Sequence, residues 1–443
     1  MANLSRSSVV FEAEAETSPS REVDSDTPFR ILILGDFSGR ANRGLKAGLA
    51  GQRPVLVDLD NFEEVMEGMQ TSLRLPGAQL RFRELDDFHP DHIYRRAEIF
   101  RKLADLPYEP PRAAAAATAP VVAGPGLLDS ILEQTEELPA PSLEDAGDLA
   151  AFIKKAVAPH LEAKPDAGKK EWAARVEAVT GEQMRAVLHH PAFQALEAAW
   201  RAAWMLVQGL GDEVKVYLLD ATLEDLLADT ATLEKLLTGP RDPWALLVGN
   251  YPFGESEEDA ARLQTLGRLA RAAGTPFLAE AQPPSDTTAP EHWQKLRQSP
   301  VAAWIGLAVP RFLLRLPYGE STSAVESFKF EEMPGSVHAE YLWGNPAFCC
   351  AWLIGQSFRS EGWDLRPGMH RQVDGLPLHV YEEGGESVTK PCAELLLSEK
   401  DAAFLLQRGY MPLASMKGQD AVLLVRFQSI AEPLAALAGR WSG

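Results

Sequence analysis

The first hundred residues alternate between short apolar runs and one amphipathic stretch. Residues 29–34 (FRILIL) form a strongly apolar run with two isoleucines, which is typical of a buried strand. Residues 55–59 and 80–83 predict two further strands, the second from its strict alternation. Residues 62–69 favour a helix because their large apolar side chains fall on one face: Phe62, Val65, Met66 and Met69. The pattern predicts a small α/β unit over residues 28–106.

A longer region alternates strand-type and helix-type segments. In order, they are residues 214–218 (strand), 223–227 (helix), 244–248 (strand), 257–273 (helix) and 277–279 (strand). This order implies a largely parallel sheet that is covered on both faces. Residues 376–426 have a more mixed α+β pattern. We therefore predict an α/β (α+β) fold with mixed sheets flanked by helices, and a second domain over residues 211–443.

The composition changes sharply between these two regions. Residues 107–126 are rich in proline, alanine and glycine, which predicts a linker between two domains. Residues 127–210 are expected to be a helical segment. Its first helix is amphipathic, with one face lined by Leu127, Leu128, Ile131 and Leu132.

Residues 1–27 are mostly polar and predict a flexible N-terminal arm. One short piece of the arm contains the alternation of a half-buried strand: Val9, Val10, Phe11, Glu12, Ala13 and Glu14. A lone strand is not stable, so this piece needs a sheet edge with which to pair.

Charge and cysteine content narrow the class of protein. The chain has 443 residues and a formal net charge of −20, which argues against binding to nucleic acid or to an anionic membrane surface. Its three cysteines include the adjacent pair Cys349 and Cys350, which favours a reducing compartment over a disulfide framework. No run approaches 18 apolar residues, and the N-terminus lacks an apolar signal core. We expect a cytoplasmic protein.

Candidate chemistry is sparse. The turn over residues 35–40 follows a strand but lacks the spacing and lysine of a phosphate loop. The acids and histidines of residues 84–92 are better explained by helix capping and solvation than by a metal site. Neighbouring side chains diverge on a helix, so His189 and His190 are poor joint ligands. We predict no catalytic, cofactor-binding or metal-binding residues and expect that the chain is not an enzyme.

Residues 28–106 resemble the small sheath subunit of type VI secretion systems, the TssB or VipA family. The matching blocks are PFRILILGDFSG (28–39), VD (57–58), DNFEEVM (60–66), LRFR (80–83) and LDDFHP (85–90). Residues 127 to about 420 resemble the large subunit, the TssC or VipB family. Its blocks are LLDSIL (127–132), HHPAFQALEAAWR (189–201), GNYPF (249–253), TPFLA (275–279), GL (306–307), PRFLLRLPYG (310–319), YLWGN (341–345) and GYMPL (409–413).

The resemblance implies a structural subunit of a contractile sheath, which assembles around an inner tube on a baseplate. In these families the small and large subunits are separate chains, so this chain is expected to be a fused protomer. Neighbouring protomers share strands, which makes residues 9–14 a candidate donor strand. The large subunit's N-terminal helix is recognised by a disassembly ATPase, and residues 127–132 match that helix.

Two departures leave an alternative open. The large family members continue for a long segment beyond the point that matches the end of this chain, and the small unit lacks its usual tail. The C-terminal strands that accept a donor strand are therefore expected to be absent. A shortened, non-polymerising sheath paralogue with a terminal, baseplate-proximal or regulatory role is the main alternative. A phosphate-binding enzyme is a third and weaker hypothesis. Expected partners are other sheath subunits, the inner tube, baseplate proteins and a disassembly ATPase, with no nucleic acid and no membrane.

Overall fold

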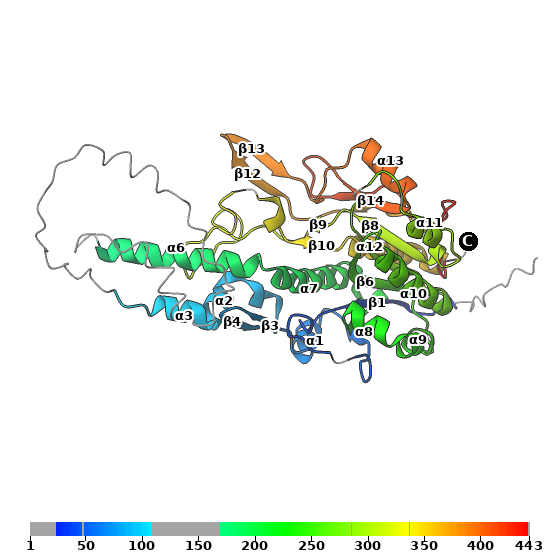
Figure 1. Ribbon diagram of the computed structural model, residues 1–443, viewed down its shortest axis with the longest axis horizontal. Helices are drawn as coiled ribbons and strands as arrows, with labels where there is room; N and C mark the ends of the chain where they lie inside the picture. The colour runs from blue at the N-terminus through cyan, green and yellow to red at the C-terminus, as the bar shows by residue number, and fades with distance from the viewer. Residues whose placement is uncertain (1–23, 47, 109–167, 285, 336, 442–443) are drawn as a thin grey trace, which may run out of the picture.

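The computed structural model describes residues 24–46, 48–108, 168–284, 286–335 and 337–441 (Figure 1). Its main element is a nine-stranded sheet in the order β11-β15-β14-β8-β7-β6-β1-β5-β2. The strands of this sheet are β1 (Phe29–Gly35), β2 (Val55–Val57), β5 (Val214–Asp220), β6 (Leu246–Phe253), β7 (Phe277–Ala281), β8 (Ile305–Val309), β11 (Gln372–Val373), β14 (Tyr410–Ser415) and β15 (Val422–Leu424). The central strands from β14 to β5 run parallel, and β2, β15 and β11 pair antiparallel at the two ends.

Helices cover both faces of this sheet (Figure 1). One face packs against α7 (Pro191–Leu210) and α12 (Ala347–Glu361). The other face packs against α8 (Leu223–Ala228), α9 (Thr230–Thr238), α10 (Glu257–Ala273), α11 (Glu291–Arg297) and α13 (Glu399–Gln407). The α/β class expected from the sequence is confirmed, and α10 has the bounds that the helical pattern predicts.

Strand β1 shows why its sequence is apolar at almost every position. Its odd-numbered residues Phe29, Ile31 and Ile33 belong to the core on the side of α7 and α12. Leu32 and Leu34 belong to the core on the opposite side. Because successive side chains point to opposite faces, a strand buried on both sides needs apolar residues throughout.

An elongated arm extends from the sheet along the long axis of the molecule (Figure 1). It contains α6 (Gly168–Leu188), which α7 follows, together with α2 (Pro90–Arg96), α3 (Glu98–Ala104) and the hairpin of β3 (Ser72–Leu75) and β4 (Ala78–Arg81). Helix α1 (Phe62–Gly68) follows β2 and precedes the β3–β4 hairpin in the chain. The apolar pattern of residues 62–69 predicts this helix. Strand β4 begins two residues before the predicted position of residues 80–83, because the buried Ala78 continues the alternation.

Two further strand pairs lie outside the main sheet. One joins β9 (Phe312–Leu313) to β10 (Trp343–Gly344), and the other is the hairpin of β12 (His379–Glu383) and β13 (Glu386–Lys390). The three cysteines are buried and unpaired. Among the described residues, no helix has the length and apolar character needed to cross a membrane.

Candidate assembly interface

The two units expected on either side of residues 107–126 share one sheet. Strand β1 lies between β5 and β6 and pairs with both, with Ile31 opposite Val216 on one side and Leu246 on the other. The strand from residues 28–106 is therefore hydrogen-bonded on both edges to strands that follow residue 210. The first unit is therefore part of the second unit's core, and strand β1 has no free edge in this sheet.

An aromatic cluster fixes the turn that follows β1. The indole Nε1 of Trp200 in α7 donates a 2.8 Å hydrogen bond to the carbonyl of Phe37. The rings of Phe37 and Phe62 lie 5.3 and 5.5 Å from the Trp200 ring, both edge-on. Edge-on aromatic pairs are favourable beyond the area that they bury, so this cluster ties α7 to the first unit.

Buried charges close the same turn. The carboxylate of Asp220, at the end of β5, accepts hydrogen bonds from the backbone N–H groups of Phe37 and Ser38 at 2.8 and 3.0 Å. Its other oxygen pairs with the guanidinium of Arg40 at 2.5 Å. Arg40 also reaches Asp225 at 3.5 Å. This network satisfies every buried charge that it joins, as buried ion pairs require.

The same network bears on whether the glycine-containing turn over residues 35–40 can bind a phosphate. A phosphate loop binds its ligand through free backbone N–H groups. Here two of those groups already donate to Asp220. Burial raises the pKa of Asp36, and the nearby charge of Asp220 adds to this rise. The hydrogen bonds that its carboxylate accepts from the backbone N–H groups of Ala41 and Arg40 act in the opposite direction. The turn is thus an acidic environment with occupied donors, which disfavours a phosphate ligand.

A second charged cluster joins α7 to the chain segment that contains Arg315 and Glu332. Arg315 lies between Glu197 of α7 and Glu332, with nitrogen–oxygen distances of 2.8 Å and 2.7 Å. Burial opposes ionisation of Glu332, but the charge of Arg315 and hydrogen bonds from His189, Arg315 and the Tyr318 backbone outweigh it. They lower the pKa of Glu332 to about 2. The first unit joins this region through Asp91, which accepts from the backbone N–H groups of residues 326 and 327.

The acid and histidine cluster of residues 84–92 has a structural role. His89 caps α2 by accepting a 3.2 Å hydrogen bond from the N–H of Asp91, as the capping interpretation predicts. Glu84, Asp87 and His92 offer ligand atoms within 4.8 Å of one another. Asp87, however, already forms an ion pair with Arg96 and accepts from the N–H of Arg83 at 2.7 Å. The cationic partner of this cluster is therefore a guanidinium.

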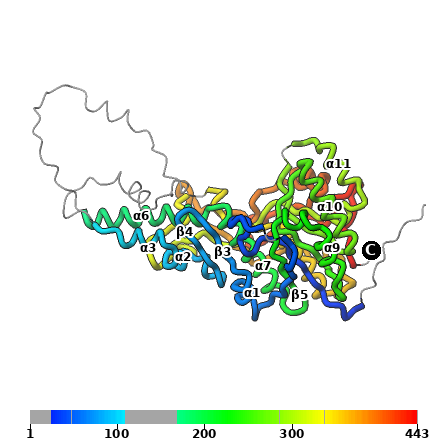
Figure 2. Tube along the Cα trace, turned by 60° about the horizontal axis from the view of Figure 1, so that its bottom comes forward, coloured from blue at the N-terminus to red at the C-terminus, as the bar shows by residue number. Residues whose placement is uncertain are grey.

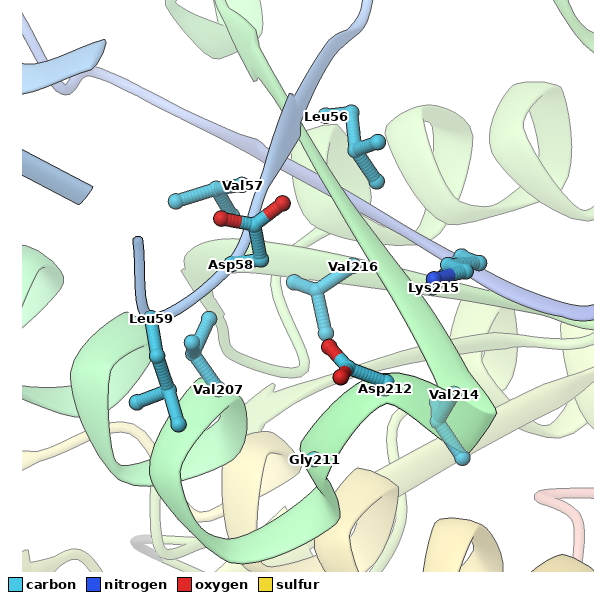
Figure 3. A pocket seen from close by; sticks show the side chains of 10 residues that line it. All are labelled: Leu56, Val57, Asp58, Leu59, Val207, Gly211, Asp212, Val214, Lys215 and Val216. Carbon is cyan, nitrogen blue, oxygen red and sulfur yellow. The ribbon is translucent and has the colours of Figure 1, made fainter. Parts of the chain in front are cut away.

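A small cavity lies at the β2 end of the main sheet. Figure 3 shows the small cavity between β2, the end of α7 and the start of β5. It is lined by Leu56, Val57, Asp58, Leu59, Val207, Gly211, Asp212, Val214, Lys215 and Val216. Its volume of about 10 Å³ holds about one water molecule. The edge strands β2 and β11 are three and two residues long, as is common for edges protected from uncontrolled pairing.

A wider cavity of about 310 Å³ lies at the carboxyl ends of β6, β7 and β8. Glu280 lines it, beside the ion pair of Arg311 and Glu394. Burial raises the pKa of Glu280 to about 7, although the charge of Arg311 works in the opposite direction. A carboxyl group with this pKa can change charge near neutral pH.

The candidate site residues of the sequence lie outside the described residues. These are the donor-strand residues Val9, Val10, Phe11, Glu12, Ala13 and Glu14, and the helix residues Leu127, Leu128, Ile131 and Leu132. The insertion of β1 into the later sheet was not predicted. The double-sided burial of residues 29–34 was the available signal, since such a strand needs a neighbour on each edge and a layer on each face.

Comparison with protein families accounts for both halves of this interface. Residues 170–285 and 285–431 match the family described as "EvpB/VC_A0108, tail sheath N-terminal domain", VipB. Residues 5–108 match the family described as "Type VI secretion system, VipA, VC_A0107 or Hcp2". The chain belongs to the VipB tail sheath family. It also carries a VipA region, so the expected fusion of small and large sheath units is confirmed.

A curated relative of this VipB-family chain supports the assignment. The type VI secretion system sheath protein TssC1 of Pseudomonas aeruginosa is 32% identical over 294 residues. The match covers 57% of this chain and 59% of TssC1. The chain thus spans less than two thirds of the length of that relative.

Proposed function

We propose that the chain is a structural subunit of a contractile type VI secretion sheath, in which one polypeptide supplies a fused small-plus-large protomer. The position of β1 carries this proposal. A VipA-region strand hydrogen-bonded on both edges to VipB-region strands forms a single folded body. Fusion keeps the two parts at a one-to-one ratio and at a high effective concentration.

The N-terminal arm is proposed to link protomers. Residues 9–14 lie within the region that matches VipA, and their alternation suits pairing with a sheet edge of another subunit. Deletion of residues 1–16 is expected to abolish binding to other sheath subunits while the melting temperature of the chain stays the same. Unchanged binding after this deletion would rule out the strand-donor role.

Further partners follow from the same proposal. The inner tube and baseplate proteins are the partners that a sheath subunit requires, and the cytoplasm is where such a sheath would assemble. Residues 127–132 are proposed as the helix that a disassembly ATPase recognises. Replacing Leu128 and Ile131 by aspartate should then prevent disassembly by that ATPase without affecting assembly.

A phosphate-binding enzyme is disfavoured by the occupied N–H groups of Phe37 and Ser38. The remaining alternative is a shortened paralogue that binds sheath proteins without polymerising. Negative-stain microscopy of the purified full chain, with and without a separate sheath pair, distinguishes these roles. Tubes from the chain alone support the protomer role, and incorporation only into tubes of the separate pair supports the paralogue role. A chain that neither forms tubes nor binds sheath proteins contradicts both.

A further inference from the structure

The β12–β13 hairpin carries an uncompensated acidic tip. Glu382, Glu383 and Glu386 are exposed and surround the turn at Gly384 and Gly385. Glu383 and Glu386 are directly opposite each other in the hairpin register. Like charges in this position destabilise a strand pair, and a two-stranded hairpin is only marginally stable by itself.

The base of the same hairpin is held firmly. The hydroxyl of Tyr341 and Nδ1 of His379 are 2.7 Å apart, and Nζ of Lys390 lies 4.9 Å from the centre of the Tyr341 ring. No ion pair or hydrogen bond within the described ranges reaches the side chains of the three tip glutamates. An anchored base and an unpaired acidic tip indicate a structure that presents its carboxylates to a partner.

A complementary surface lies on the β3–β4 hairpin. Its inner face is buried through Leu73, Leu75 and Leu80. Its outer face exposes Arg74 and Arg81, which are diagonal neighbours because Arg74 pairs with Gln79 and Arg81 with Ser72. In the part of the chain that the structure describes, neither guanidinium has a carboxylate partner. Diagonal positions lie within reach of long side chains, so the two arginines form one cationic face.

The two hairpins lie on opposite sides of the molecule. In Figure 1, β12 and β13 are at the upper margin, and β3 and β4 are at the lower margin. Figure 2, in which the bottom of the molecule comes forward, shows β3 and β4 at the front. A single copy therefore cannot bring its own acidic tip to its own arginine face.

We propose that the acidic β12–β13 tip of one copy docks on the Arg74–Arg81 face of the β3–β4 hairpin of a second copy. This inference deepens the proposed sheath function and rests on it. Two different, complementary patches form a heterologous contact, and repetition of such a contact builds rings or open helical arrays. A chain with a net charge of −20 also needs local charge pairing if its copies are to pack together.

The contact can be tested by cross-linking in the full chain. Gln79 lies opposite Arg74 on the basic face, and Ser387 lies opposite Glu382 at the acidic tip. Mixed Q79C and S387C chains, treated with a short bismaleimide, should give a covalent dimer. The three natural cysteines are buried, so they add little background. Q264C, at an exposed position of α10, is the matched control and should give no more product with S387C than random collision does.

Charge reversal tests the chemistry of the contact. R74E/R81E in the Q79C chain should reduce the cross-linked product on the order of tenfold. E382K/E383K/E386K in the S387C chain should restore the product when it is mixed with the R74E/R81E chain. The exposed pair R268E and E234K, on α10 and α9, provides a charge-reversal control that should leave the yield unchanged. Unchanged melting temperatures verify that each variant is folded.

Two outcomes would overturn the inference: a Q79C–S387C yield equal to that of the Q264C control, or a yield insensitive to R74E/R81E. If the unsubstituted chain forms tubes and R74E/R81E forms the same tubes, the docking contact is rejected while the sheath function stands. Failure of the sheath function itself has a different readout. In that case the unsubstituted chain forms no tubes and binds no sheath protein.

Discussion

The indole of Trp200 donates its hydrogen bond to the carbonyl of Phe37, across the join between the VipB and VipA regions. The same carbonyl accepts a second hydrogen bond, of 3.1 Å, from the hydroxyl of Thr71. The turn after β1 is therefore held by two donors: Trp200 of α7 in the VipB region and Thr71, just before β3, in the VipA region. Loss of one donor leaves the carbonyl with the other.

Substitution of Trp200 separates the hydrogen bond from the packing. W200F keeps a ring between Phe37 and Phe62 and removes one donor, so it should cost about 1 kcal/mol of unfolding free energy. W200A also leaves a cavity and should cost roughly 3–5 kcal/mol. The half-buried Trp204 provides the control, since W204A should cost clearly less than W200A. Chemical denaturation measures all three. Equal effects of W200A and W204A would contradict the anchoring role of Trp200.

Substitution of Asp220 should strongly destabilise the protein, because its carboxylate is buried beside Arg40. D220N removes the charge that faces Arg40 and places an amide near a guanidinium, so it should cost roughly 3–5 kcal/mol. Asp225 contacts the same guanidinium at 3.5 Å, and D225N should cost less. Thermal unfolding compares the two variants. A D220N protein as stable as D225N would show that the Arg40–Asp220 pair does not hold the join.

The sequence specified the elements of this fold better than their arrangement. Residues 257–273 and 62–69 were identified as helices because their apolar periodicity is local information. Strand β1 was identified as well, but its neighbours β5 and β6 follow it by more than 180 residues, and local patterns do not encode such pairings. The buried clusters around Arg40 and Arg315 were missed for the same reason, since their partners meet only in the folded chain.

The β12–β13 hairpin and the turn over residues 35–40 show two further limits of prediction from this sequence. Gly384-Gly385 between strand-like residues is a recognised hairpin signal, so β12–β13 was accessible from the sequence. The sequence disfavours a phosphate site in the turn over residues 35–40 through its motif spacing and its missing lysine. The physical reason, an Asp220 carboxylate on its N–H groups, comes from a residue far away in the chain.

Gly39 is expected to tolerate no side chain. Its φ is +74°, and a Cβ there would lie 2.3 Å from the carbonyl oxygen of Ser72. Gly44 has a similar φ of +66° but open space around it. G44A should therefore show only the cost of the left-handed backbone, about 1 kcal/mol. G39A should cost at least about 1 kcal/mol more, because the β3 backbone has to move. Denaturation of the two variants side by side measures the difference, and equal losses would contradict the close approach.

Glu280 should make the protein less stable as the pH rises towards neutrality. Burial raises its pKa from 4.5 to about 7 in the folded state, so the folded chain holds this proton more tightly than the unfolded chain does. Below about pH 4.5 the group is protonated in both states and adds no pH dependence. Between about pH 4.5 and 7 the unfolded state loses the proton first, and stability falls by at most ~3 kcal/mol.

E280Q tests this sign directly. The glutamine keeps the neutral shape of the protonated acid, so the variant should be more stable than the unsubstituted chain at pH 7.5 and equally stable near pH 4.5. E234Q, at an exposed position of α9, is the control and should leave the pH profile unchanged. Melting temperatures recorded from pH 4.5 to 8 give the comparison. A Glu280 that instead stays ionised in the folded state would make E280Q neutral or destabilising at pH 7.5, because its attraction to Arg311 would be lost.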